Sequence, residues 1–242
     1  MTIQGMTFDE EAYGKAVGRM LNDSKTIREL DISNCEFVHP KCFFDMCSAL
    51  LTEKCRLNCI RFRGIAITNL EAKVIQFILM KNKLIHTIDL SMCRIDNPEN
   101  LDHFIQKFDH YSAVRYLTLD GITPDISPSV EMFGYALSLN CKMEVLMMRE
   151  LKIKWQSYCK FWEGMSENQH LKKISVAKTD MTDRVVESMS YFLKQPDMQV
   201  IDLDLSRNLI TCEGLACLCA GIIANKTIKF LNLGSNCIKD KG

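Results

Sequence analysis

Histidine and cysteine are the side chains of this sequence that could bind a metal ion, and their spacing decides whether they do. The chain of 242 residues carries five histidines and twelve cysteines. No histidine lies at a zinc-type spacing from a cysteine or from another histidine. His103 and His110 share one face of an expected helix, which is more typical of surface polar residues than of a metal pair. Since Cys217 and Cys219 point in different directions on another expected helix, we expect no metal site and no cofactor.

Sequence motifs for other catalytic chemistry are missing. The chain contains no G-x-x-x-x-G-K-[ST] or G-x-G-x-x-G phosphate-binding loop and no G-x-S-x-G nucleophile elbow. Its eleven glycines are mostly scattered and offer no cradle for a phosphate group. The sequence therefore favours a protein that is not an enzyme.

Basic residues gather at two places, which raises the question of nucleic-acid binding. The two clusters contain Arg56, Arg61, Arg63, Lys172, Lys173 and Lys178. The acidic residues between them are Asp89, Asp96, Asp120 and Asp125. A nucleic-acid interface needs a continuous basic stripe, and these carboxylates interrupt it. Thirty basic and thirty acidic residues also leave no net charge to attract nucleic acid or an anionic membrane, so we expect neither partner.

The elements that position these side chains recur along the chain. In the segment 200–210, apolar residues occupy the first, fourth, sixth and eleventh places, and Asn208 occupies the ninth. The first place recurs, at separations of 28 to 30 residues, at Ile27, Leu57, Ile85, Val114, Met143, Leu171, Val200 and Ile228. The fourth and sixth places are apolar in all eight copies. This unbroken period predicts one domain of eight units over residues 27–242, of which the last unit is incomplete.

This pattern resembles the leucine-rich repeat signature, and units of this length with a strand and a helix resemble its ribonuclease-inhibitor-like subclass. The resemblance covers residues 27–238. It implies an α/β leucine-rich repeat solenoid shaped like a horseshoe, with parallel strands on the concave face and helices on the convex face. The widths of the elements agree with this shape, because strands pack about 4.8 Å apart whereas helices are about 10 Å across.

The ninth place of each unit predicts how the turns after the strands are held. In this family an asparagine or cysteine there hydrogen-bonds exposed backbone groups of the turn. Four units keep this pattern, with Cys35, Cys93, Asn208 and Asn236. The others carry Ile65, Ile122, Leu151 and Thr179, which predicts less regular turns in the middle of the chain.

The second half of each unit is predicted to be a helix with its own start signal. The expected helices span residues 40–52, 69–81, 98–110, 128–139, 155–167, 183–194 and 212–224. Thr68 and Glu71 form a capping box. The other expected N-cap residues are Asn97, Ser127, Thr182 and Thr211. Residues 1–26 are expected to form an N-terminal capping helix over 8–21, which begins at a capping box of Thr7 and Glu10.

The cysteines and the apolar runs predict the compartment. Cysteines fall on the ninth place, as Cys35 does, or in helical stretches, as Cys47 does, and they form no cluster at either end. Free and buried thiols are the expected state, which indicates a cytoplasmic protein. The first residues lack the basic and apolar regions of a secretory signal. The longest apolar runs are too short to span a membrane.

Outward-pointing strand residues give the candidate binding site. Alternate residues of a strand point to opposite faces, so the third, fifth and seventh places face away from the core. In the middle units this face carries Tyr116, Val145 and Met147 as neighbours. Apolar and aromatic residues beside arginine have the composition of interface hot spots, although scattered exposed apolar residues are also ordinary. The expected protein-binding residues are Arg61, Arg63, Asp89, Tyr116, Asp120, Val145, Met147 and Arg149.

The preferred interpretation is a non-enzymatic scaffold that binds a cytoskeletal, ciliary or signalling protein through the concave face. Similar repeats occur in tropomodulins, CARMIL-type actin regulators, NOD-like receptors and ciliary assembly proteins. The alternative is a regulator of a small GTPase that resembles Ran GTPase-activating protein, although that family has an acidic tail after its repeats that this chain lacks. The incomplete eighth unit predicts that the chain is a fragment or that another surface covers its edge, with self-association through that edge as one outcome.

Overall fold

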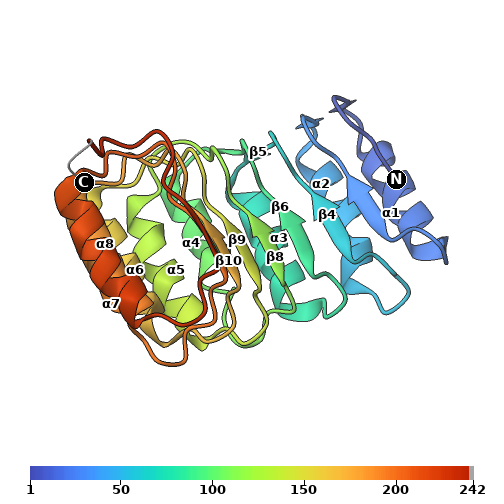
Figure 1. Cartoon of the computed structure of the whole chain (residues 1–242). Helices are drawn as coiled ribbons and strands as arrows, with labels where there is room; N and C mark the ends of the chain where they lie inside the picture. Colours follow the sequence, from blue (N-terminus) through green and yellow to red (C-terminus); the bar gives the residue numbers. More distant parts are fainter. Residues whose placement is uncertain (240–242) are drawn as a thin grey trace.

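The computed structural model describes residues 1–239, with the exception of the side chain of Pro40. Its main feature is one parallel sheet of eight strands in chain order, which confirms the predicted solenoid (Figure 1). The strands are β2 (Glu29–Asp31), β4 (Cys59–Arg61), β6 (Thr87–Asp89), β8 (Tyr116–Thr118), β9 (Val145–Met147), β10 (Lys173–Ser175), β11 (Asp202–Asp204) and β12 (Phe230–Asn232). Two small parallel sheets are formed by β1 (Thr7–Phe8) with β3 (Glu36–Phe37) and by β5 (Ala66–Ile67) with β7 (Arg94–Ile95).

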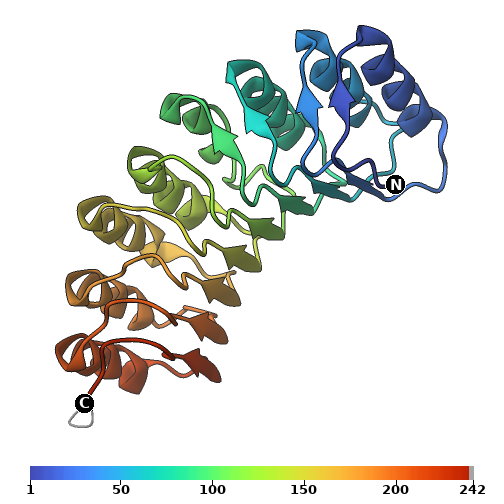
Figure 2. The ribbon, with the colours of Figure 1, turned by 90° about the horizontal axis from the view of Figure 1, so that it is seen from above.

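Helices cover the opposite face of the large sheet. They are α1 (Glu11–Asp23), α2 (Pro40–Ser48), α3 (Asn69–Lys81), α4 (Pro98–Ile105), α5 (Ser127–Leu139), α6 (Trp155–Gly164), α7 (Asp183–Leu193) and α8 (Cys212–Ala224). Short 3₁₀ segments, η1 (Ala49–Leu51) and η2 (Met165–Glu167), continue α2 and α6. Figure 2 shows the strands along the inner side of an arc and the helices along its outer side. The stack bends because strands are narrower than helices.

The sheet keeps the repeat places in register. Third-place residues pair with third-place residues on the next strand, as Tyr116 does with Val145. The fourth and sixth places point into a core that runs the length of the stack, and Leu30 in the first unit has 0% of its surface exposed. Leu231 is 37% exposed, because β12 is the last strand in the part of the chain that the structure describes.

The turn after each strand uses a left-handed residue at the eighth place. The residues with positive φ there are Asn34, Gly64, Met92, Gly121, Glu150, Lys178, Arg207 and Ser235. In the first seven units the N–H of this residue donates to the seventh-place carbonyl of the next unit, as from Asn34 to Arg63 at 2.7 Å. Glycine adopts this conformation at the least cost, yet six of the eight residues are not glycine. The eighth place is therefore regular in every unit, and the expectation of irregular middle turns was wrong there. The sixth unit alone among the described turns has a second left-handed residue, Asp180 at its tenth place.

Side chains at the ninth place add hydrogen bonds between neighbouring units. Sγ of Cys93 donates to the carbonyl of Phe62 at 3.2 Å. Nδ2 of Asn208 donates to the carbonyls of Val176 and Leu205, at 3.0 and 2.9 Å. The corresponding bonds run from Cys35 to Ile3 and from Asn236 to Leu205. The predicted role of these four residues is confirmed.

A second set of asparagines follows the helices and was not predicted. Asn82, Asn140, Asn168 and Asn225 each lie three residues before the first place of the next unit. Their Nδ2 groups donate to carbonyls of the preceding unit, as Asn82 does to Leu50 at 2.6 Å. Their Oδ1 atoms accept from two main-chain N–H groups just ahead of the next strand. The recurrence of asparagine at one spacing is the signal that could have revealed this ladder.

The N-terminal segment differs from its prediction. The helix α1 begins at Glu11, and the residues before it form β1, which pairs with β3. The first five residues run beside β2, where the N–H of Ile3 donates to the carbonyl of Asp31 at 2.7 Å. The capping box of Thr7 and Glu10 was wrong, because Thr7 belongs to a strand and the cap position Glu10 makes no side-chain capping bond. This segment therefore extends both the sheet and the helical layer.

Most of the other predicted helix starts are confirmed. The capping box of Thr68 and Glu71 is present at the start of α3. Asn97 and Thr211 accept the expected capping bonds from main-chain N–H groups. The predicted cap at Ser127 was wrong, since this residue lies inside α5 and its Oγ accepts from the N–H of Lys154 at 2.7 Å. The prediction for Thr182 was also wrong in part, because it precedes α7 but its side chain caps no N–H among the described residues.

The helix α4 is shorter than predicted. The sequence predicts a helix over 98–110, whereas α4 ends at Ile105. The N–H of Phe108 donates to the carbonyl of Ile105 at 3.3 Å, so the chain tightens into a turn after the helix. Phe108 is fully buried and packs against Phe133, with the ring centroids 5.8 Å apart. Burial of the Phe108 ring in the core therefore accompanies the early end of the helix.

The cysteines are unpaired, as predicted. All twelve lie in the described part of the chain, but only six of them are buried, so the expectation of buried thiols holds for half of them. Burial raises the pKa of the Cys93 thiol to about 12, so this side chain acts as a small apolar group with a weak donor. Within residues 1–239, none of the helices combines the length and the apolar composition that a membrane span requires.

Candidate protein-binding face

The three apolar residues of the predicted site lie together on the concave face. Tyr116 on β8 and Val145 on β9 are register partners, and Met147 follows two residues further along β9. Tyr116 is 42% exposed, and the other two are partly exposed. Their alternation with buried fourth-place residues directs them away from the core. The predicted neighbourhood is therefore present, and the binding of a partner there stays a prediction.

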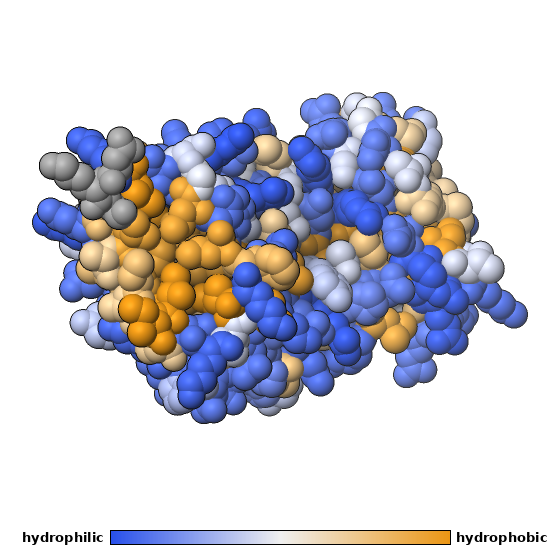
Figure 3. Space-filling view, viewed as in Figure 1, coloured by the Kyte–Doolittle hydropathy of each residue, from blue (hydrophilic) through white to orange (hydrophobic). Residues whose placement is uncertain are grey.

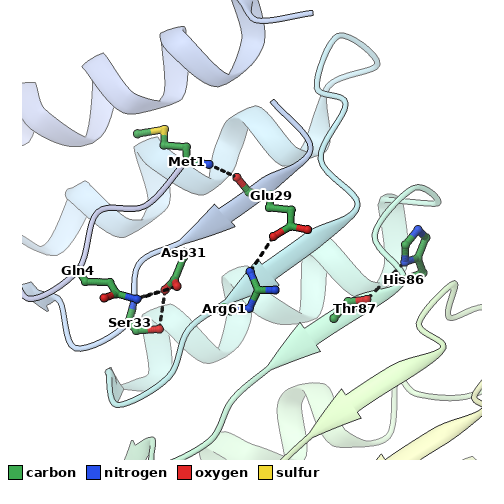
Figure 4. Close-up of polar contacts among 8 residues, drawn as sticks. All are labelled: Met1, Gln4, Glu29, Asp31, Ser33, Arg61, His86 and Thr87. Carbon is green, nitrogen blue, oxygen red and sulfur yellow. Dashed lines mark hydrogen bonds and ion pairs between the residues drawn. The ribbon is translucent and has the colours of Figure 1, made fainter. Parts of the chain in front are cut away.

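Arg61 is held across the sheet by an acidic residue on the neighbouring strand. Its Nη1 lies 3.0 Å from Oε2 of Glu29 on β2 (Figure 4). The hydrogen bond that Arg61 donates to this carboxylate raises the pKa of Arg61. Arg63, two residues further, is exposed and has no acidic partner among residues 1–239. The N-terminal half of the face therefore presents one fixed guanidinium and one that can meet an incoming carboxylate.

Asp89 has a structural role that the sequence did not reveal. Its Oδ1 accepts from the N–H of Ser91 at 2.8 Å and also from the Ser91 hydroxyl. The same turn recurs at Asp31 with Ser33 and at Asp204 with Ser206. Burial by itself raises the pKa of Asp31, but the hydrogen bonds from Ser33 and Gln4 and the charge of Arg61 together outweigh it, and the pKa is lowered. Asp89 is therefore a turn-forming residue, and only its Oδ2 is unused by the described residues.

Asp120 is buried and engaged by Arg149 of the next unit. Its Oδ1 accepts from the main-chain N–H of Arg149 at 2.7 Å. Its Oδ2 accepts from Nε and Nη2 of the same residue, at 2.8 and 2.6 Å. Only 6% of the surface of Asp120 is exposed, so a partner meets Arg149 and not the carboxylate. The structure thus brings this pair together and assigns Asp120 the task of orienting the arginine.

A hollow on the same face adjoins Arg149 and was not predicted. Its volume is about 480 Å³, and it spans units five to eight. Other charged residues that line it are Glu150, Lys178, Asp204 and Arg207. Room for the hollow comes from small seventh-place residues, namely Ala177, Ser206 and Gly234. This run of small residues in one column is the signal that sequence reasoning could have used.

Comparison with known proteins agrees with this geometry. Residues 224–242, which include β12, match the family described as Leucine Rich repeat. A mouse protein, "NACHT, LRR and PYD domains-containing protein 5", is 22% identical over 278 aligned positions that cover 99% of this chain. The chain has the fold of a leucine-rich repeat solenoid. It spans 23% of the length of that mouse relative.

The concave face of the solenoid carries apolar, aromatic and basic side chains close together. No group of three or more histidine, cysteine, aspartate or glutamate side chains within residues 1–239 could hold a metal ion. The side chains that face outward combine apolar contact area at Tyr116 with guanidinium groups at Arg61 and Arg149. Aromatic residues and arginine are the types that carry most binding energy in protein interfaces.

Proposed function

We propose that this leucine-rich repeat protein is a non-enzymatic scaffold that binds a protein partner on its concave face. The observation that carries the proposal is the cluster of Tyr116, Val145 and Met147 on adjacent strands of a sheet whose backbone is fixed by regular pairing. An apolar anchor on a rigid strand loses little conformational freedom on binding, which favours affinity.

The charges around the cluster favour a protein over a polyanion. Arg61 and Arg149 are each paired with a carboxylate of a neighbouring unit. Their guanidinium groups are therefore held in place and partly neutralised, whereas nucleic acid binds to unpaired basic groups that release counterions. Fixed donors next to an apolar patch suit the mixed surface of a protein, in which charge sets orientation and specificity.

The alternative function, regulation of a small GTPase, would require an arginine that is not bonded within the protein. A catalytic arginine must be free to stabilise the charge that develops on the transferred phosphoryl group. Arg61 and Arg149 are both engaged within the sheet, and of the three predicted arginines only Arg63 lacks a carboxylate partner among residues 1–239, so we favour the scaffold. GTP hydrolysis by purified small GTPases, measured with and without the protein, separates the two functions, and acceleration would support the alternative.

We further propose a cytoplasmic setting and weak self-association. The twelve unpaired cysteines in the described part of the chain suit a reducing compartment. At this end of the stack, Ile223 on α8 is 85% exposed and Phe230 on β12 is 65% exposed. Figure 3 shows apolar surface gathered over α8 and the neighbouring end of the stack. Exposed apolar residues beside an unpaired strand edge invite pairing with another molecule.

The concave site is tested with two substitutions and one matched control. Tyr116→Ala and Met147→Ala remove anchors that point away from the core, and Tyr191→Ala removes a tyrosine of α7 that is 61% exposed on the convex side. A partner is first identified by affinity purification and mass spectrometry, and its affinity is then measured by calorimetry. Loss of an anchor costs about 2 kcal/mol or more, which is roughly a thirtyfold loss of affinity. Normal binding by both concave variants, with loss of binding in Tyr191→Ala, would contradict the proposal.

A further inference from the structure

The helix α4 leaves a gap on the convex surface between its two neighbours. It has eight residues, whereas α3 and α5 have thirteen each. This difference exceeds one turn of helix. Figure 2 shows the helices following one another along the outer side of the arc, so the short helix lies between two longer ones. The gap opens beside the carboxyl ends of α3 and α5.

Two adjoining hollows occupy this gap. One has a volume of about 560 Å³ and the other about 330 Å³, and both are lined by Lys107 and Asp109. We refer to them together as the α4 groove. The buried Leu79 and Ala136 line it, and its exposed apolar lining residues are Met80, Tyr111, Met132, Tyr135 and Leu139. All five are at least 37% exposed, which is unusual for large apolar side chains gathered in one place.

The charges at the rim of the α4 groove are unbalanced. Oε2 of Glu131 pairs with Nζ of Lys160 at 2.9 Å. Oδ1 of Asp109 accepts from a main-chain N–H, which leaves the negative charge of this carboxylate in the groove. The hydrogen bond from Lys160 lowers the pKa of Glu131, so this carboxylate stays ionised and paired. Lys107 in the groove and Lys83 beside it have no carboxylate partner among residues 1–239. The rim therefore has two such lysines against the one carboxylate of Asp109, which leaves one excess positive charge among the described residues.

We propose that the α4 groove binds an amphipathic helix of another protein, with leucine, phenylalanine or methionine anchors flanked by glutamate or aspartate. An anchor enters the space that the last turns of α4 would have filled, between Met80 on one side and Tyr135 and Leu139 on the other. The flanking carboxylates meet Lys83 and Lys107. An amphipathic helix presents apolar residues every three or four positions and lies naturally in such a groove. This surface lies on the helical face of the sheet, so the proposal is independent of the concave site.

The test uses a displayed library of helical peptides and the full chain. Each peptide has about four helical turns, with apolar anchors fixed at helical spacing and equal numbers of glutamate and lysine codons elsewhere. Selection on the wild-type protein should enrich glutamate over lysine. A selected peptide should bind Tyr135→Ala about tenfold more weakly than wild type. Selection on Lys107→Glu should move the preference toward lysine.

Two controls and one further measurement complete the test. Tyr191→Ala, on α7, and Tyr116→Ala, on the concave face, should bind the selected peptide as wild type does. The proposal is overturned if no peptide is enriched, if lysine-rich peptides win, or if Tyr135→Ala binds normally. Binding that is lost in Tyr116→Ala places the peptide on the concave face and also overturns it. Sedimentation of the wild type and of Tyr135→Ala tests whether a second copy of the chain occupies the α4 groove. We expect the same self-association in both, and a loss of self-association in Tyr135→Ala would overturn the proposal.

Discussion

Both carboxylate oxygens of Asp120 are bonded to Arg149, one to its main-chain N–H at 2.7 Å and the other to its guanidinium at 2.6 and 2.8 Å. The two partners differ in environment, because the side chain of Asp120 is 9% exposed and that of Arg149 is 47% exposed. A buried charge that loses its partner is costly, whereas an exposed charge regains water. The pair therefore stabilises the carboxylate more than the arginine.

We expect Arg149→Ala to destabilise the protein more than Asp120→Ala does. The first change leaves a buried carboxylate with a single N–H donor, at a cost of about 2 kcal/mol. The second leaves a half-exposed guanidinium that water can solvate, together with the main-chain N–H of Arg149 that has lost its acceptor, at a combined cost of about 1 kcal/mol. Urea denaturation of both variants and of the double variant measures the difference. Equal costs, or a larger cost for Asp120→Ala, would show that the two groups do not depend on each other in this way.

Asn208→Ala should be among the most damaging polar substitutions in the chain. Its amide donates to the carbonyls of Val176 and Leu205, and its Oδ1 accepts from the N–H groups of Thr179 and Met181, at 2.9 and 3.1 Å. Each buried group left without a partner costs about 1–3 kcal/mol, so we expect a total loss of about 3 kcal/mol or more. Asn232→Ala is the matched control, since this residue is exposed. If Asn208→Ala loses less stability in urea denaturation than Asn232→Ala does, the expectation is wrong.

The stability of the fold should fall in alkali. Burial raises the pKa of Cys93 from 9.0 to about 12, so the unfolded chain releases this proton at lower pH than the folded chain does. The folded state is therefore fully favoured below pH 9 and loses that advantage as the pH rises from 9 to about 12. The slope for one such thiol is about 1.4 kcal/mol per pH unit. Cys93→Ala should show a shallower decline in urea denaturation across this range, and an unchanged slope would rule out this thiol as its source.

The chain should self-associate weakly through the end of the stack at β12. Ile223 and Phe230 are exposed there, and the outer edge of β12 is unpaired among the described strands. Sedimentation velocity should show concentration-dependent association that weakens in Ile223→Glu or when a polar capping repeat is fused after residue 242. Tyr191→Glu serves as the control for an exposed apolar residue elsewhere. A strictly monomeric wild-type chain would contradict the expectation.

The sequence predicts the strands and the face that each residue occupies, because one apolar pattern recurs at nearly constant spacing. It predicts the neighbourhood of Tyr116 and Val145 for the same reason. It does not predict the burial of Asp120, since that depends on a partner 29 residues away whose side chain folds back over the turn. The sequence also does not predict the early end of α4. Phe108 continues the apolar spacing of a helix, but in the structure it lies after the helix and is buried in the core.

The hydrogen bonds between units run in both directions along the stack. The turn of each unit donates to the carbonyl of the following unit, whereas the ninth-place side chains donate to the preceding one, as Cys93 does to Phe62. When a unit at one end unfolds, the neighbouring unit loses hydrogen-bond donors and acceptors. That neighbour is therefore less stable and unfolds next. Unfolding then proceeds from the ends toward the middle of the stack. The amide hydrogens of the central strands β8 and β9 therefore exchange with solvent last.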